Sequence, residues 1–181
     1  MKKLLLLGTL FLLPFLSVAQ EIFDKYQNSD KVTFISMQPK MFQMLARMSV
    51  NTNDPEAQDF FELVNSITSF KVITTQDKLI TKEVSTWVVS QEKQDYQELM
   101  RVKENGATIK FFIQEGKDED HVKELLMFVT GVDELDLNMK GMNIDTVLLS
   151  LSGEINLNAI SKLTDMMQLP GGDQLRKASQ K

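Results

Sequence analysis

The chain has no cysteine and only one histidine, one tryptophan and two tyrosines among its 181 residues. Without cysteine it forms no disulfide bond and carries no lipidated cysteine, so its stability has to come from a hydrophobic core. A zinc site is not expected from a single histidine without cysteine. The scarcity of tryptophan and tyrosine also argues against a sugar cleft, which is lined by stacking aromatic side chains.

Motifs that mark nucleotide and acyl-transfer sites are missing as well. There is no G-x-G-x-x-G or Walker sequence, and Gly171-Gly172 follows a predicted helix instead of opening one. A Ser-His-Asp triad would have to use His121, the one histidine, but no G-x-S-x-G elbow accompanies it. We therefore predict no catalytic residue, no cofactor, no metal and no enzymatic activity.

The N-terminal residues 1–19 have the pattern of a signal peptide. Lys2 and Lys3 precede the apolar run Leu4–Leu16, and Ser17-Val18-Ala19 supplies small residues for a cleavage site before Gln20. The run is shorter than the roughly 20 residues that span a bilayer, which favours cleavage over an uncleaved membrane anchor. We expect a periplasmic or secreted mature chain with no further transmembrane segment.

The expected mature chain is acidic. Loss of Lys2 and Lys3 leaves 18 of the 20 basic residues against 25 acidic ones, so the formal charge falls from −5 to −7. Nucleic acids and anionic membrane surfaces both favour basic patches, and we expect neither as a partner. The length suits one domain over residues 20–172, with a flexible tail over 173–181.

Apolar spacing and turn residues divide the first half of this domain into strands and helices. We predict a short helix over 21–29, a strand over Lys31–Met37, helices over Pro39–Met48 and from Pro55 to about Ser69, and a strand over Phe70–Thr75. Helical spacing predicts core positions at Met41, Met44, Leu45 and Met48, and then at Phe60, Phe61, Val64 and Ile67. Residues 77–93 contain many strand formers but do not alternate, so a helix is preferred to a strand there.

The centre of the chain predicts a β-hairpin. Asn105-Gly106 suits a two-residue type I′ turn, which pairs Met100 with Phe111 and Glu98 with Ile113. On this register the core face carries Met100, Val102, Ile109, Phe111 and Ile113, and the mixed outer face carries Leu99, Arg101, Lys103, Thr108, Lys110 and Phe112.

Two more strands and a helix complete the predicted domain. They are a strand over His121–Val129, a polar connection over Gly131–Gly141, a strand over Asp145–Gly153 and a helix over Asn156–Met167. The order β-α-α-β-α-β-β-β-β-α predicts an α+β fold, a mostly antiparallel sheet with helices packed on one face.

The best candidate site is an interaction face on the hairpin, formed by Leu99, Arg101, Lys103, Lys110 and Phe112. A half-apolar face among basic residues is typical of a docking or dimer surface. The rival explanation is that the helix over 77–93, or the C-terminal tail, covers it.

Two weaker candidates remain. Asp118-Glu119-Asp120 could bind calcium, or with Glu115 serve glycoside hydrolysis, but the spacing is not that of an EF-hand, so a solvated loop is preferred. The cluster of Met37, Met41, Met44 and Met48 is interpreted as core, although methionines also form adaptable binding surfaces and bind copper.

Four segments resemble one family. They are Met37-x-Pro-x-Met-Phe42, Tyr96-x-Glu-Leu-Met-x-Val-Lys103, Lys123-Glu-Leu-Leu-Met-Phe-Val129 and Leu149-x-Leu-x-Gly-Glu-Ile-x-Leu157. Over nearly the whole mature chain the sequence resembles the bacterial domain-of-unknown-function family numbered 4252. That resemblance implies a small exported protein of the Gram-negative envelope and assigns no catalytic residue or ligand. Many members are lipoproteins, from which this chain departs by lacking a cysteine after its leader.

These features together predict a non-catalytic exported envelope protein that acts through protein–protein interaction, including self-association, or in envelope maintenance. The alternative is a periplasmic binder of a small apolar ligand, held between the Met-rich helix and the sheet. A hydrolase using the acidic loop ranks last.

Overall fold

The computed structural model describes residues 19–48, 55–104, 106–131 and 144–158. Several predicted features lie outside these residues: nearly all of the leader, Asn105 of the turn, most of the Gly131–Gly141 connection, the closing helix beyond Asn158 and the C-terminal tail.

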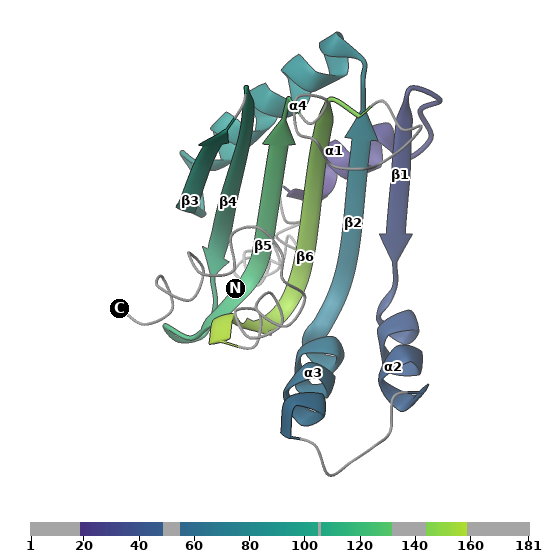
Figure 1. Ribbon diagram of the computed structural model, residues 1–181, viewed down its shortest axis with the longest axis vertical. Helices are drawn as coiled ribbons and strands as arrows, with labels where there is room; N and C mark the ends of the chain where they lie inside the picture. Colours follow the sequence, from purple (N-terminus) through teal and green to yellow (C-terminus); the bar gives the residue numbers. More distant parts are fainter. Residues whose placement is uncertain (1–18, 49–54, 105, 132–143, 159–181) are drawn as a thin grey trace, which may run out of the picture.

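Six antiparallel strands form one sheet in the order β1-β2-β6-β5-β4-β3 (Figure 1). The strands are β1 (Val32–Met37), β2 (Ile67–Thr75), β3 (Tyr96–Glu104), β4 (Ala107–Glu115), β5 (His121–Thr130) and β6 (Thr146–Asn156). The last four strands in sequence form a β3-β4-β5-β6 meander, and β2 joins β6 to the short edge strand β1. The predicted α+β class and mostly antiparallel sheet are confirmed.

Within the described ranges, the sheet is accompanied by helices α1 (Ala19–Tyr26), α2 (Pro39–Met48), α3 (Pro55–Ser66) and α4 (Lys78–Gln91). The helix predicted over residues 77–93, in preference to a strand, is confirmed as α4. Its N-cap is Asp77, whose carboxylate accepts hydrogen bonds from the backbone of Leu79 at 2.9 Å and of Ile80 at 3.2 Å. None of the helices that the structure describes is long and apolar enough to cross a membrane.

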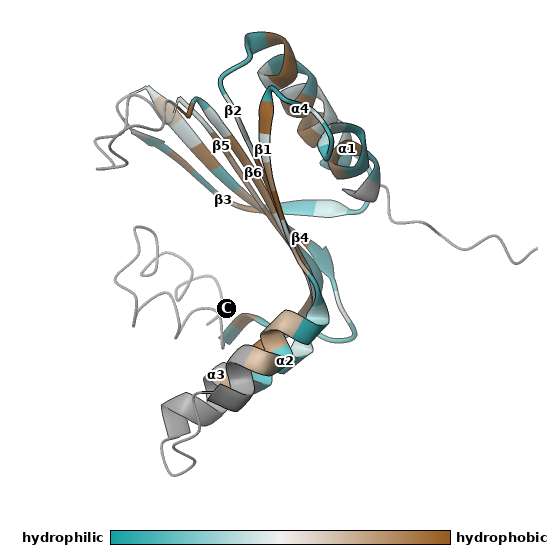
Figure 2. Cartoon of the chain, turned by 90° about the vertical axis from the view of Figure 1, so that its right-hand side faces the viewer, coloured by the Kyte–Doolittle hydropathy of each residue, from teal (hydrophilic) through white to brown (hydrophobic). Residues whose placement is uncertain are grey.

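The helices do not all lie on one face of the sheet. Helices α1 and α4 cover the face that we call the helix face, whereas α2 and α3 extend from one end of the sheet (Figure 2). The main core lies under α1 and α4 and includes Phe23, Ile73, Val84, Phe112, Leu126 and Leu148. Leu63 and Val64 of α3 pack instead in clusters with Leu151 of β6, whose side chain points to the opposite face from that of Leu148. Because successive side chains of a strand point to opposite faces, the core under α1 and α4 lies on one face of the sheet and the contacts of α3 lie on the other.

Two of the four clustered methionines, Met41 and Met44 of α2, do not face the core, whereas Met37 packs against the cluster that contains Phe42. Met41 is 47% exposed and Met44 is 52% exposed, so the core interpretation is wrong for both. Phe42 is the buried residue of this turn, and its ring packs edge-to-face on Phe70 of β2 with centroids 6.5 Å apart. The side chains of Leu45 and Met48 lie outside the described residues.

Helix α3 is shorter than predicted. It ends at Ser66, and Ile67 is buried as the first residue of β2 and not as part of a helix. Of the predicted inward positions, Val64 and Ile67 are buried, Phe61 is partly buried, and the side chain of Phe60 lies outside the described residues. Leu63, which was not predicted, is buried as well.

The β3–β4 hairpin has the predicted register near its turn but not at its far end. Met100 lies opposite Phe111 as expected, whereas Glu98 lies opposite Phe112 and not Ile113. A β-bulge at Leu99 inserts one extra residue into β3 and causes this shift.

Candidate functional site

The central residue of the predicted docking face, Phe112, belongs to the core of the domain. Phe112 is 1% exposed and belongs to the cluster under α1 and α4, so its prediction as a docking residue is wrong. The rival explanation, that the helix over 77–93 covers this face, is the one that the structure supports. The sequence pattern misled because the outer hairpin face looked mixed, while Leu126 and Phe128 on β5 continue it as an apolar surface for α4.

Two basic residues of that face, Arg101 and Lys110, pair with acidic partners. Lys110 Nζ lies 3.2 Å from Glu92 Oε1, just after α4, and Arg101 Nε donates a 2.8 Å hydrogen bond to Glu98. The bond from Arg101 lowers the pKa of Glu98 below its ordinary value. The Lys110–Glu92 pair connects the end of α4 to the hairpin, whereas the Arg101–Glu98 pair lies within β3.

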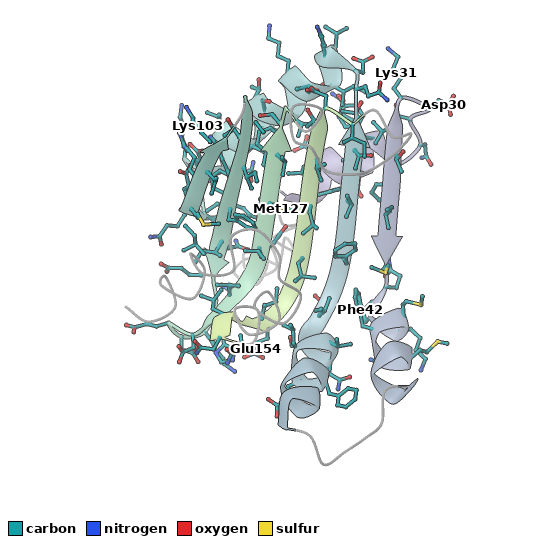
Figure 3. All side chains as sticks on the ribbon, viewed as in Figure 1. Asp30, Lys31, Phe42, Lys103, Met127 and Glu154 are labelled. Carbon is teal, nitrogen blue, oxygen red and sulfur yellow. The ribbon has the colours of Figure 1, made fainter. Side chains whose placement is uncertain are left out.

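The remaining two residues of the predicted face separate. The bulge turns Leu99 to the opposite face, where it packs in a cluster with Phe111. Lys103, near the end of the outer strand β3, is exposed (Figure 3). The five predicted residues therefore do not form one surface.

The two edges of the sheet differ in a way that bears on interaction. The outer strand β3 carries Glu98, Arg101 and Lys103 and is interrupted by a bulge, and charges and bulges both protect an edge from pairing. The other outer strand, β1, has the sequence VTFISM, with no charge and no proline, and pairs with β2 in an unbroken register over all six residues. No described strand pairs with its outer side. Among the residues that the structure describes, β1 is therefore an unprotected edge.

Exposed apolar side chains accompany this edge. Ile35 at the middle of β1 is 46% exposed, and α2, which begins two residues after β1, exposes Met41 and Met44. We call β1 and the exposed side of α2 the β1 edge surface. Sequence reasoning missed it because an edge strand and a central strand look alike until the strand order is known.

A polar hollow of about 540 Å³ lies where α3, the β4–β5 loop and the end of β6 meet. Its lining includes Glu62, Ser66, Lys117, His121, Glu154 and Asn158. Inside the lining, Lys117 pairs with Glu154. The predicted acidic loop thus borders a hollow of mixed charge and not an acidic one.

His121 forms a hydrogen bond with Asp118 of the acidic β4–β5 loop. His121 Nδ1 lies 2.6 Å from Asp118 Oδ1, and this hydrogen bond lowers the pKa of Asp118. Asp118 also accepts a 3.1 Å bond from the backbone of Asp120. Within the part of the chain that the structure describes, no three histidine, aspartate or glutamate side chains are grouped as metal ligands. The contacts seen here brace the loop.

A buried carboxylate lies on the helix face of β5. Glu124 is 4% exposed and accepts hydrogen bonds from Ser150 Oγ at 2.6 Å and Tyr96 Oη at 2.9 Å. Burial raises the pKa of Glu124, and the two hydrogen bonds oppose this rise in part. Burial, and then the charge of Glu124, also raises the pKa of Tyr96. The sequence signal for this site is that Glu124 shares strand parity with Leu126 and Phe128.

The chain was compared with known families, curated proteins and solved structures. The model of a family described as "Domain of unknown function (DUF4252)" matches residues 26–163, which span every strand of the sheet. No curated protein and no solved structure matches the chain.

Proposed function

The chain belongs to the DUF4252 family, and from this premise we propose that it is a non-catalytic, exported protein of the bacterial envelope that acts by protein–protein interaction at the β1 edge surface. Export rests on the leader pattern of residues 1–19. The mode of interaction is strand addition, in which an extended segment of another chain pairs with the free side of β1.

The observation that carries this proposal is the contrast between the two edges of one sheet. Strand β3 has the charges and the bulge that discourage pairing, whereas β1 has neither and exposes Ile35. An unprotected edge is a hazard for aggregation, so a protein that protects one edge and leaves the other open has a use for the open one.

Two side chains that could take part in acid–base chemistry, Glu124 and His121, make contacts that stabilise the fold. The Glu124 carboxylate binds Tyr96 and Ser150 in the interior, and His121 braces the β4–β5 loop through Asp118. These arrangements favour a binding protein over a hydrolase.

The alternative of an apolar ligand between α2 and the sheet is not retained. Side chains fill that space: Phe42 packs on Phe70, with Met37 and Leu151 in the same cluster. Met41 and Met44 are exposed instead of facing the sheet.

In-cell photo-crosslinking tests the proposal. A photoreactive amino acid at Ser36, an exposed residue of β1, should give a discrete adduct, and one at Thr86, exposed on α4, should not. Ile35→Lys should remove the Ser36 adduct because a charge in the middle of an edge discourages pairing. Val89→Lys is the matched control: Val89 is 44% exposed, close to the 46% of Ile35, but lies on α4. No adduct at Ser36, or an adduct that survives Ile35→Lys, would overturn the proposal.

A further inference from the structure

We propose that the partner at the β1 edge is a second copy of this chain, paired through β1 about a two-fold axis that passes beside Ile35. This inference rests on the proposed function and adds the identity of the partner. It predicts a continuous sheet across two chains, with the β1 strands antiparallel at its centre.

Symmetry restricts how two such edges can meet. Two copies of one edge strand that pair antiparallel are related by a two-fold axis perpendicular to the sheet, so both chains keep the same face on the same side. Side chains alternate between faces along a strand, and residues directly opposite one another share a face. One residue of β1 must therefore lie opposite its own copy.

The exposure of the β1 side chains selects that residue. Phe34 points to the helix face and already packs against the main core, whereas Ile35 points to the other face and is 46% exposed. Pairing Ile35 with its copy makes a cross-strand contact between two β-branched side chains and removes their apolar surface from water. In this register Thr33 lies opposite Met37 of the second copy.

Charge is compatible with the same register. Strand β1 has no charged residue, and Lys31 at its start forms an ion pair with Asp77 at 2.7 Å. Asp30, in the turn before β1 (Figure 3), is placed close to the start of the second copy's α2, where Lys40 is exposed. Neither Asp30 nor Lys40 forms an ion pair with any other described residue. Two such opposite-charge approaches, one at each end, favour the two-fold arrangement.

The size of the contact sets its expected strength. A strand of six residues offers few ladder hydrogen bonds, and small interfaces are typical of weak, reversible association. We therefore expect a dimer that forms with concentration, with a Kd on the order of micromolar.

Single cysteines test the register directly, because the chain has none of its own. In the proposed dimer the Cα atoms of residue 35 and its copy lie about 5 Å apart, within reach of a disulfide. The two copies of residue 33 lie four residues apart along the strands, about 14 Å, which no disulfide spans. Full-length chains carrying Ile35→Cys or Thr33→Cys, exported and purified under reducing conditions, are then oxidised mildly at equal concentration. We expect Ile35→Cys to give at least ten times more covalent dimer than either Thr33→Cys or the α4 control Val89→Cys.

A charge-swap experiment gives an independent readout. Ile35→Lys and Ile35→Asp should each be monomeric in sedimentation velocity, because like charges then face each other across the axis. An equimolar mixture should restore the dimer, since Lys and Asp now lie opposite. Unchanged circular dichroism shows that the variants fold. A mixture that stays monomeric, or equal cross-linking at positions 33 and 35, would overturn self-pairing.

The two proposals fail in distinguishable ways. A Ser36 adduct with the mass of this chain plus a different protein, together with no Ile35→Cys dimer, overturns self-pairing and leaves strand addition at β1 intact. An adduct of twice the chain mass supports both. The absence of any adduct and of any disulfide dimer overturns both.

Discussion

Lys110 Nζ lies 5.8 Å from the ring centroid of Phe112, two residues along the same face of β4. The ammonium group reaches Glu92 at 3.2 Å near the end of α4, while the Phe112 ring is buried beneath that helix. The pair marks the rim of the main core, with the aromatic ring inside and the charge at the boundary. The hairpin face that the sequence predicted as a docking surface for another protein is thus covered by α4 of the same chain.

Phe112→Asp should prevent the domain from folding. Removing a buried phenylalanine costs about 3 to 5 kcal/mol, and a buried unpaired carboxylate adds to that loss. Thermal unfolding followed by circular dichroism measures the effect. Lys103→Asp, on the exposed rim of the same face, is the control and should change the free energy of unfolding by less than about 0.5 kcal/mol. A stable, cooperatively folded Phe112→Asp protein would contradict the position of α4.

The free energy of unfolding of the Glu124→Gln variant, relative to that of the parent chain, should increase as the pH rises from 4 to 8. Because burial raises the pKa of Glu124 above its ordinary value of 4.5, the unfolded chain ionises more readily than the folded one. The resulting penalty is absent below the unfolded-state pKa, grows as the pH rises towards the folded-state pKa and is constant above it. Glutamine removes this penalty at the cost of one acceptor for Tyr96 or Ser150.

Urea unfolding at several pH values gives the difference in free energy between the two proteins. Glu115→Gln, which makes the same chemical change at an exposed end of β4, is the matched control. A Glu124→Gln difference that falls with rising pH would mean that the folded state prefers the charged form.

Gly153→Ala should destabilise the sheet where β2 begins. A Cβ atom at Gly153 would lie 2.2 Å from the carbonyl oxygen of Ser66, and a backbone atom cannot rotate away as a side chain can. With the positive φ of 153° at this residue, we expect a loss of about 1 to 3 kcal/mol in urea unfolding. Gly106→Ala serves for comparison, because Gly106 also has a positive φ but is exposed in a turn. An equal effect of the two changes would argue against close contact at Gly153.

Polar replacements in the α2 stripe should leave stability unchanged. Met41→Gln and Met44→Gln alter exposed side chains, so each should stay within about 0.5 kcal/mol of the parent. Phe42→Ala, between them, should cost about 3 to 5 kcal/mol because it removes the ring that packs on Phe70. Comparable losses at Met41 and Phe42 would restore the core interpretation of the methionines.

Signals within short stretches of the sequence predict the fold class and most of the secondary structure of the described residues. Strand formers, helical apolar spacing and the Asn105-Gly106 sequence act through neighbours in the chain, so the α+β order and the inner part of the hairpin register could be predicted. Whether a face of a strand or helix is buried depends on residues that are distant in the sequence. The contact of α4 with Phe112, the bulge at Leu99 and the burial of Phe42 in place of Met41 depend on long-range packing.

The tertiary structure alone decided which strands are edges. Strands β1 and β2 have similar local sequences, but β2 is paired on both sides and β1 on one, because β6 returns along the chain to pair with β2. Strand order is a property of the whole sheet and leaves no mark on six consecutive residues. For that reason the sequence pattern favoured the charged hairpin as the interaction face, whereas the outer strand without charges is β1, with Ile35 at its middle.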